Sequence, residues 1–168
     1  MSEVLRFNEC DQQALLNLLK ALGMRTQLVS DEATIPGSFW GDEEAGLIGN
    51  AIYIRADTPV HSALHEACHF VCMDEQRREA LHTNAGGDAD EENAVCYLQI
   101  LLSDALPDLG RKRILKDMDA WGYSFRLGSA KAWFENDATD AFEWLSGRGL
   151  IEVAEKLTHT HRIADVQV

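Results

Sequence analysis

The sequence predicts an α+β protein in which a small antiparallel or mixed sheet packs on a mostly helical bundle. Three observations predict this class. The strand-like segments all precede residue 56, helical segments dominate after it, and 46% of the 168 residues are hydrophobic, which suffices for a buried core. Because the chain has no repeat and no Pro/Gly-rich linker, we expect one domain over residues 1–168.

The first part of the chain, residues 1–56, is expected to form one helix and then strands. In DQQALLNLLKALG the leucines recur at helical spacing, and Gly23 is typical of the left-handed residue that follows a helix. TQLVS is then a short strand. LIGNAIYIR predicts a further strand that can bend at Gly49-Asn50.

The next segment, residues 57–106, is predicted to hold two longer helices. Thr58 can cap the first of them, because Pro59 fits the first helical position, where its missing N–H costs nothing. We expect this helix to reach about Leu81, where HTNAGGD interrupts the helical pattern.

The second of these helices, EENAVCYLQILLSDAL, is expected to begin at Asp88 or Asp90 and to end near Pro107. Shorter helices are predicted over residues 107–168. Their aromatic residues are expected to pack in the core: Trp121, Trp133, Phe134, Phe142 and Trp144.

Composition restricts the partners of the protein. With 28 acidic and 15 basic residues the net charge is −13, and such a surface repels phosphate backbones, so we expect no nucleic-acid partner. No apolar run approaches the ~20 residues of a membrane span, and the first residues lack the pattern of a signal peptide. We therefore expect a cytoplasmic protein with no membrane partner, in which the four cysteines are buried thiols.

The segment SALHEACHFVCMDE contains the pattern His-Glu-x-x-His. On a helix, His65 and His69 project from one face, about 40° apart, which suits two ligands of a single Zn²⁺. Glu66 lies about 100° from His65, where it can act as a general base on a water molecule without binding the metal. The opposite side of the helix is apolar, so the helix has a packing face and a chemical face.

A catalytic zinc has three protein ligands and an open position, so a third ligand has to come from elsewhere in the chain. The second helix begins with Glu91 and Glu92, and a turn at Gly86-Gly87 can fold it back against the first helix. On a helical wheel Glu91 shares the side of the apolar residues, whereas Glu92 lies about 100° away, at the margin. This phase favours Glu91 as the ligand. A capping box with Asp88 is the alternative role for Glu91.

HEACH, followed further along the chain by EENAVCYLQILL, resembles the gluzincin metallopeptidases and, within them, the ImmA/IrrE-like group. In that group the third ligand opens an E-x-x-A helix that continues with an aromatic residue and a leucine pair. The matching positions here are Glu91, Ala94, Tyr97 and Leu101-Leu102. The resemblance covers about residues 46–106. It implies a zincin-like fold, one Zn²⁺ per chain and Glu91 as the third ligand.

The motif and the resemblance together favour a zinc-dependent hydrolase, specifically a peptidase that acts on a peptide or protein substrate. The metal ligands would be His65, His69 and Glu91, and the general base would be Glu66. The strand LIGNAIYIR could pair with an extended peptide. The loop that carries Phe39 and Trp40 could form a wall of the substrate site or a hydrophobic plug that closes the sheet. The residue that stabilises the oxyanion is left open among four candidates: Tyr53, His82, Tyr123 and Arg126.

Two other functions remain open at this stage. The protein could bind zinc in a regulatory or structural role, with a silent metallopeptidase motif, in which case Glu66 would be dispensable. Alternatively, it could be an acidic, mostly helical interaction protein without a metal. The sequence leaves the oligomeric state open.

Overall fold

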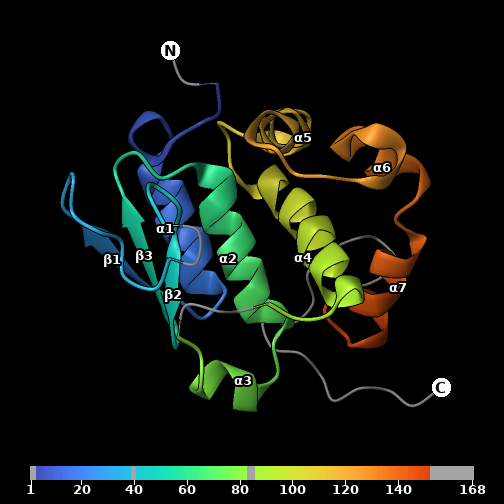
Figure 1. The fold of residues 1–168 in the computed structure, drawn as a ribbon, viewed down its shortest axis with the longest axis horizontal. Coiled ribbons are helices and arrows are strands. Elements are labelled where there is room, and N and C mark those ends of the chain that lie inside the picture. Colours follow the sequence, from blue (N-terminus) through green and yellow to red (C-terminus); the bar gives the residue numbers. More distant parts are fainter. Residues whose placement is uncertain (1–2, 39–40, 83–85, 152–168) are drawn as a thin grey trace.

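The computed structural model describes residues 3–38, 41–82 and 86–151 and confirms the α+β class (Figure 1). The strands are β1 (Arg25–Val29), β2 (Gly46–Ile48) and β3 (Ala51–Arg55). The helices are α1 (Gln12–Ala21), α2 (Val60–Cys72), α3 (Glu75–Glu79), α4 (Ala89–Leu102), α5 (Gly110–Trp121), α6 (Ala130–Asn136) and α7 (Thr139–Gly147). Phe39 and Trp40, expected to form either a wall of the substrate site or a plug of the sheet, lie outside the described residues, as does the tail from residue 152.

The sheet is mixed, with the order β1-β3-β2. β1 runs parallel to β3, and β2 pairs with β3 in the antiparallel direction. The segment LIGNAIYIR, predicted as one strand with a bend, is therefore a hairpin. The reversal falls at Gly49-Asn50, where Gly49 takes the positive φ of 58° that glycine adopts without strain. As a result β3 is the central strand of the sheet.

Helix α2 lies between the sheet and α4, and it contacts β2, β3, α4 and α5 (Figure 1). It begins at Val60, one residue later than expected, with Pro59 at the N-cap position and no cap from Thr58. The Thr58 hydroxyl instead accepts a hydrogen bond of 2.9 Å from the backbone N–H of Arg55, at the end of β3. Almost every residue of α2 is buried, so its polar side chains have to find partners inside the protein.

The helix predicted to reach Leu81 ends earlier, at Cys72. Asp74 accepts a hydrogen bond of 2.9 Å from the backbone N–H of Arg77 and so caps a separate short helix, α3. The buried Arg78 guanidinium donates to two backbone carbonyls in the last turn of α2. In this way α3 closes the end of α2, where carbonyl groups lack partners within the helix.

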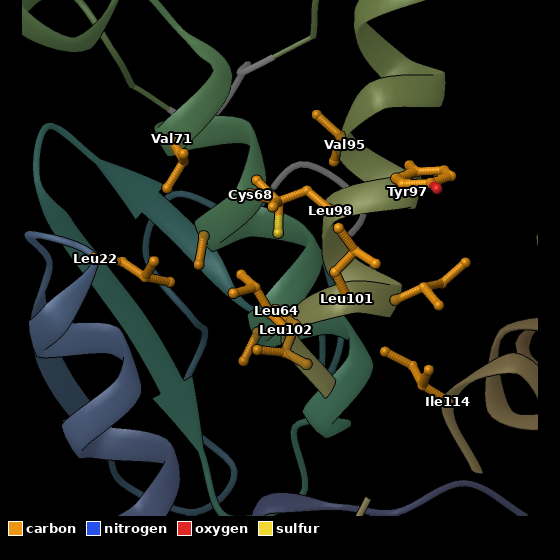
Figure 2. Packing of buried hydrophobic residues seen from close by; sticks show 14 of the residues in the cluster. Leu22, Leu64, Cys68, Val71, Val95, Tyr97, Leu98, Leu101, Leu102 and Ile114 are labelled. Atoms are coloured by element: carbon orange, nitrogen blue, oxygen red, sulfur yellow. The ribbon is translucent and has the colours of Figure 1, made fainter. Parts of the chain in front are cut away.

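Helix α4 begins after Asp88, whose carboxylate accepts from the backbone N–H of Glu91 at 2.8 Å. It ends at Leu102 and continues as a short 3₁₀ turn, Ser103–Ala105, before Pro107. Between α2 and α4 the packing is apolar (Figure 2). The residues that form this part of the core are Leu64, Cys68, Val71, Val95, Leu98 and Leu102.

Helices α5 to α7 agree with the shorter helices predicted after residue 107. Trp133 is buried, and Phe134, Phe142 and Trp144 pack against the core, as expected. Trp121, predicted to be a core residue, instead lies at the edge of a cavity. None of the described helices combines the length and the apolar character that crossing a membrane requires.

Candidate metal centre

His65 and His69 lie one turn apart on α2, with their Nε2 atoms 3.1 Å apart. Glu92, in the first turn of α4, reaches both of them. One carboxylate oxygen lies 3.1 Å from Nε2 of His65 and the other lies 3.3 Å from Nε2 of His69. Among the described residues, these three form the group whose ligand atoms lie close enough together, within 4.8 Å of one another, to hold a metal ion.

The structure therefore brings Glu92, and not the expected Glu91, to the two histidines. The Glu91 side chain is 7% exposed, as its place on the inward side predicted. However, its carboxylate pairs with the guanidinium of Arg77 through two hydrogen bonds of 2.7 and 2.8 Å. A buried carboxylate does need a partner, and for Glu91 that partner is an arginine from α3.

The helical wheel favoured Glu91 over Glu92 because it assumed that α4 has a single buried side, whereas α4 is buried on almost all sides. Every residue from Ala94 to Leu102 is buried, so the apolar residues of α4 face α7 and α5 as well as α2. An apolar stripe consequently does not identify the side that faces α2. Glu92 lies at the margin of the helix, and 45% of its side chain is exposed.

Gln99, which the sequence analysis did not single out, fixes the proton on His65. Its amide nitrogen donates to the backbone carbonyl of His61 at 2.8 Å, and a carbonyl can only accept. The Gln99 amide oxygen therefore faces Nδ1 of His65, at 2.9 Å, and accepts its proton. In neutral His65 the lone pair is then on Nε2, which points to Glu92 and His69. This is the tautomer that binds a metal through Nε2.

The residues present fit a zinc ion. Two imidazole nitrogens and a carboxylate are a common ligand set of catalytic zinc, and nitrogen ligands favour zinc over Mg²⁺ or Ca²⁺. The Nε2 atoms of His65 and His69 and the carboxylate oxygens of Glu92 lie 3.1–3.3 Å apart. When all of them carry lone pairs, they repel one another unless a proton or a cation lies between them. Burial alone would raise the pKa of Glu92, but hydrogen bonds from His65 and His69 outweigh burial and hold this pKa well below its usual range.

Glu66 lies on α2 beside this group, and its residue is only 8% exposed. Its carboxylate makes no hydrogen bond to the part of the chain that the structure describes. Burial raises the pKa of Glu66, although His65 and His69 act in the opposite direction. Glu66 also lines a cavity, and a raised pKa suits a group that accepts and returns a proton.

Next to these residues is a cavity of about 350 Å³. It lies where α2 and α4 meet the loop before β2 and the end of α5. Its lining consists of Glu44, Ser62, His65, Glu66, Glu92, Trp121, Gly122 and Tyr123. His65 and Glu66 on α2 and Glu92 on α4 thus open into the same space as residues that are distant in the sequence.

Of the four candidates for stabilising an oxyanion, Tyr123 is the one that lines this cavity. Tyr53 lies on the central strand β3. His82 is exposed and forms a bridge with β2. The Arg126 side chain is 82% exposed and pairs with Asp137.

The hydrogen bonds of Tyr123 determine where its proton can go. Its hydroxyl oxygen lies 3.3 Å from the Gln99 amide nitrogen, which donates, and 3.1 Å from Nδ1 of His61. Burial lowers the pKa of His61 to about 3, so this imidazole is neutral. Its Nε2 is buried without a partner. Because orphaned buried N–H groups are rare, we place the His61 proton on Nδ1. Tyr123 then accepts twice, and its own proton is free to point into the cavity.

Strand β2, at one edge of the sheet, does not offer the free backbone edge that was expected to pair with a peptide. Along its outer side, the Leu47 N–H donates to the carbonyl of Gly37 at 3.1 Å, and Ile48 forms a bridge with His82. β3, the other part of the predicted strand, is paired on both sides. The expectation of edge pairing along residues 47–55 is therefore wrong.

No family model matches the chain, and neither a curated protein nor a solved structure matches it. The resemblance to the gluzincins therefore stays a prediction from the motif residues, and Glu91, which the E-x-x-A match assigned as the third ligand, pairs with Arg77 instead.

Proposed function

We propose that the protein is a zinc-dependent hydrolase of the gluzincin type, with a peptide or protein as its substrate. The observation that carries this proposal is the convergence of His65, His69 and Glu92, of which His65 and Glu92 line one cavity together with Glu66. In this proposal α2 and α4 provide the metal-binding helices of a zincin-like arrangement, and Glu92 takes the place that the sequence assigned to Glu91.

A bound zinc ion would supply Lewis-acid chemistry, lowering the pKa of a water molecule toward ~7 and polarising the substrate carbonyl. Glu66 takes the proton of the attacking water and later returns it to the leaving amine. Its position supports this role, because the carboxylate lines the cavity and is not engaged by a hydrogen bond to the described residues.

Tyr123 is proposed to stabilise the negative charge that develops on the carbonyl oxygen. Its hydroxyl lines the cavity and is held by Gln99 and His61, which both donate to it. Such donors are most effective when they are fixed before the reaction. Gln99 contacts both Tyr123 and His65, so one side chain orients the oxyanion donor and a metal ligand.

The experiment that tests the proposal combines metal analysis with a single substitution. Protein purified without added metal should contain about one zinc per chain, and it should hydrolyse members of a mixed peptide library. Glu66→Gln should retain zinc and thermal stability but lose about 10²–10⁴-fold in hydrolysis rate, because an amide cannot accept the proton. Glu79→Gln, at an exposed position on α3, is the matched control.

Three results would contradict the proposal. Folded protein that refuses added zinc would exclude a metal centre. Zinc binding without hydrolysis of any peptide would instead favour a regulatory or structural zinc protein with a silent motif. Full activity of the Glu66→Gln variant would exclude Glu66 as the base.

A further inference from the structure

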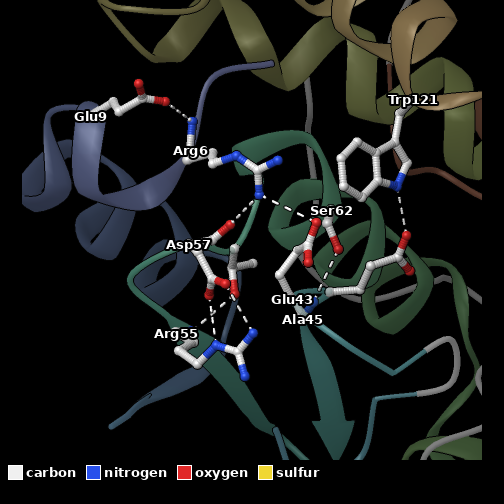
Figure 3. A network of polar contacts seen from close by, with 10 residues as sticks. Arg6, Glu9, Glu43, Ala45, Arg55, Asp57, Ser62 and Trp121 are labelled. Carbon is white, nitrogen blue, oxygen red and sulfur yellow. Dashed lines mark hydrogen bonds and ion pairs between the residues drawn. The ribbon is translucent and has the colours of Figure 1, made fainter. Parts of the chain in front are cut away.

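Two adjacent carboxylates, Glu43 and Glu44, have different surroundings. Glu43 pairs with the guanidinium of Arg6 at 3.4 Å, as Figure 3 shows. Glu44 lines the cavity, and its hydrogen bond comes from the indole N–H of Trp121 at 2.6 Å. An indole N–H carries no charge. Glu43 is therefore paired directly with a cation, whereas the charged group that acts favourably on Glu44 is His65, which does not form an ion pair with it among the described residues.

The position of Glu44 is fixed from two sides. The next residue, Ala45, donates its backbone N–H to the Ser62 hydroxyl at 3.0 Å, in a buried hydrogen bond (Figure 3). Ser62 lies on α2, one turn before Glu66. Trp121 holds the carboxylate itself. The loop before β2 thus presents Glu44 to the same space as Glu66, and little conformational freedom remains to be lost when a ligand binds.

The cavity has an excess of negative charge. Its described lining contains Glu44, Glu66 and Glu92 and no lysine or arginine. Glu92 contacts the two histidines, and Glu66 is nine-tenths buried without a hydrogen bond to the described residues. Burial raises the pKa of Glu44, so a cation bound beside this carboxylate would favour its ionised form. A divalent ion would offset two of the three negative charges, which leaves one uncompensated.

We propose that Glu44, held by Trp121, binds a cationic group of the substrate. The group is an alkylammonium or guanidinium, supplied either by the free amino terminus of a peptide or by a lysine or arginine side chain. This inference rests on the proposed function, because the subsite belongs to the same cavity. A carboxylate and a cation form a charge-assisted hydrogen bond, and the net charge of −13 attracts basic peptides over a longer range.

Binding of three small probes to the zinc-loaded full chain tests the subsite without requiring turnover. Norleucinamide carries only an α-ammonium, N-acetyl-lysinamide carries only a side-chain ammonium, and N-acetyl-norleucinamide is neutral. In isothermal titration calorimetry, one of the two cationic probes should bind roughly 10-fold or more tightly than the neutral probe. The cationic probe that binds more tightly than the neutral one shows whether the cation is an amino terminus or a side chain.

Substitutions assign this preference to Glu44. Glu44→Gln can still accept the Trp121 N–H and should abolish the preference, whereas the matched control Glu43→Gln should keep it. A preference that survives Glu44→Gln would overturn the proposal, because an amine bound directly to zinc would then account for it. Equal binding of all three probes by the unaltered protein would overturn it as well.

Hydrolysis of a peptide library separates this inference from the proposed function. Glu44→Gln should lower kcat/KM about 10-fold for cationic peptides and leave neutral peptides unchanged. Cleavage without any cation preference, or an equal loss for all peptides, would overturn the subsite and leave the hydrolase intact. Probe binding that depends on Glu44 in a protein that cleaves no peptide would support the subsite and overturn the hydrolase.

Discussion

The two sides of the α2–α4 pair differ in how completely their side chains are satisfied. On one side, Leu64, Cys68 and Val71 of α2 meet Val95 and Leu98 of α4, and all five are fully buried. This contact is apolar (Figure 2). It resembles the interior of any stable protein, where close-packed apolar side chains leave no polar group to satisfy.

On the other side, the same two helices enclose polar groups. His65 and Gln99 satisfy each other, and Gln99 also satisfies the His61 carbonyl. However, Nδ1 of His69 and Nε2 of His61 are buried without a partner, and Glu66 has no hydrogen bond within the described ranges. Native proteins keep few such groups.

The two sides of the α2–α4 pair therefore serve different purposes. The apolar side supplies stability and needs nothing further. The polar side costs stability, and of its residues His65, Glu66 and Glu92 open into the cavity, where a ligand can reach them. Proteins tend to depart from consistent packing at functional sites. Substitutions on one side should therefore change stability, and substitutions on the other should change binding and activity.

The largest effect is expected from removing the carboxylate that contacts both histidines. Four-ligand zinc sites bind with about 10–16 kcal/mol, so one ligand contributes roughly 3–4 kcal/mol. Glu92→Ala should therefore lower zinc affinity about 10²–10³-fold, measured by competition with a chromophoric chelator. Without metal the variant should also lose some stability at neutral pH, because His65 and His69 lose the carboxylate that they contact.

Glu91→Ala is the matched control for this prediction. It should leave zinc affinity nearly unchanged and lower stability by about 1–3 kcal/mol, because Arg77 loses its buried partner. A larger loss of zinc with Glu91→Ala than with Glu92→Ala would show that the contacts of Glu92 are not metal contacts.

Much of the fold could be predicted because its signals are local. Asp88 begins α4 through its side chain, and Gly23 takes the left-handed conformation expected after a helix, with φ of 90°. The two faces of α2 could also be predicted, because its histidines and its apolar residues recur at different phases of the same helical repeat. Local sequence patterns are sufficient for such features.

The contact of Glu92 with the two histidines and the cavity could not be predicted, because they depend on contacts between distant segments. Glu91 and Glu92 are chemically identical, and the pair that Arg77 forms with Glu91 decides which of them is left for the histidines. Gln99 gave a weak signal, as a polar residue within an apolar run and two turns after Glu92. Nothing in the sequence near Glu44 indicates that Trp121 lies beside it.

The second prediction concerns the donor at the cavity wall. Tyr123→Phe removes one hydroxyl and should lower kcat by about 10²-fold or more, with little change in KM, because an oxyanion donor acts mainly in the transition state. The rates are to be measured on the peptides that the unaltered protein cleaves. Tyr53→Phe, on β3, is the control and should retain activity. A rise in KM alone would indicate that Tyr123 binds substrate instead.

The third prediction concerns a substitution on the apolar side of the α2–α4 pair. Leu98 is fully buried between α2 and α4, so Leu98→Ala should lower the free energy of unfolding by about 2–3 kcal/mol. Zinc affinity of the folded protein should stay within a few-fold. Leu127→Ala is the control, because that side chain is 60% exposed and its removal should be neutral. Urea titration followed by circular dichroism measures both. Loss of zinc binding in folded Leu98→Ala protein would show that the two sides are coupled.

The smallest effect is the contribution of His61 to the pH dependence of stability. Burial lowers its pKa to about 3 in the folded protein, whereas an unfolded histidine titrates near 6.5. Below pH ~6.5 the unfolded chain therefore binds a proton that the folded protein refuses, so stability is fully present above this pH and is lost as pH falls toward 3. The loss is at most about 1.4 kcal/mol per pH unit.

In His61→Asn, whose amide can still donate to Tyr123 but cannot titrate, stability should fall less steeply between pH ~6.5 and ~4.5. Urea midpoints of metal-free protein, with chelator present, measure the difference, since the other acid-sensitive groups are common to both proteins. Parallel pH profiles would mean that His61 is protonated in the folded state, and the proton direction assigned to Tyr123 would fall with it.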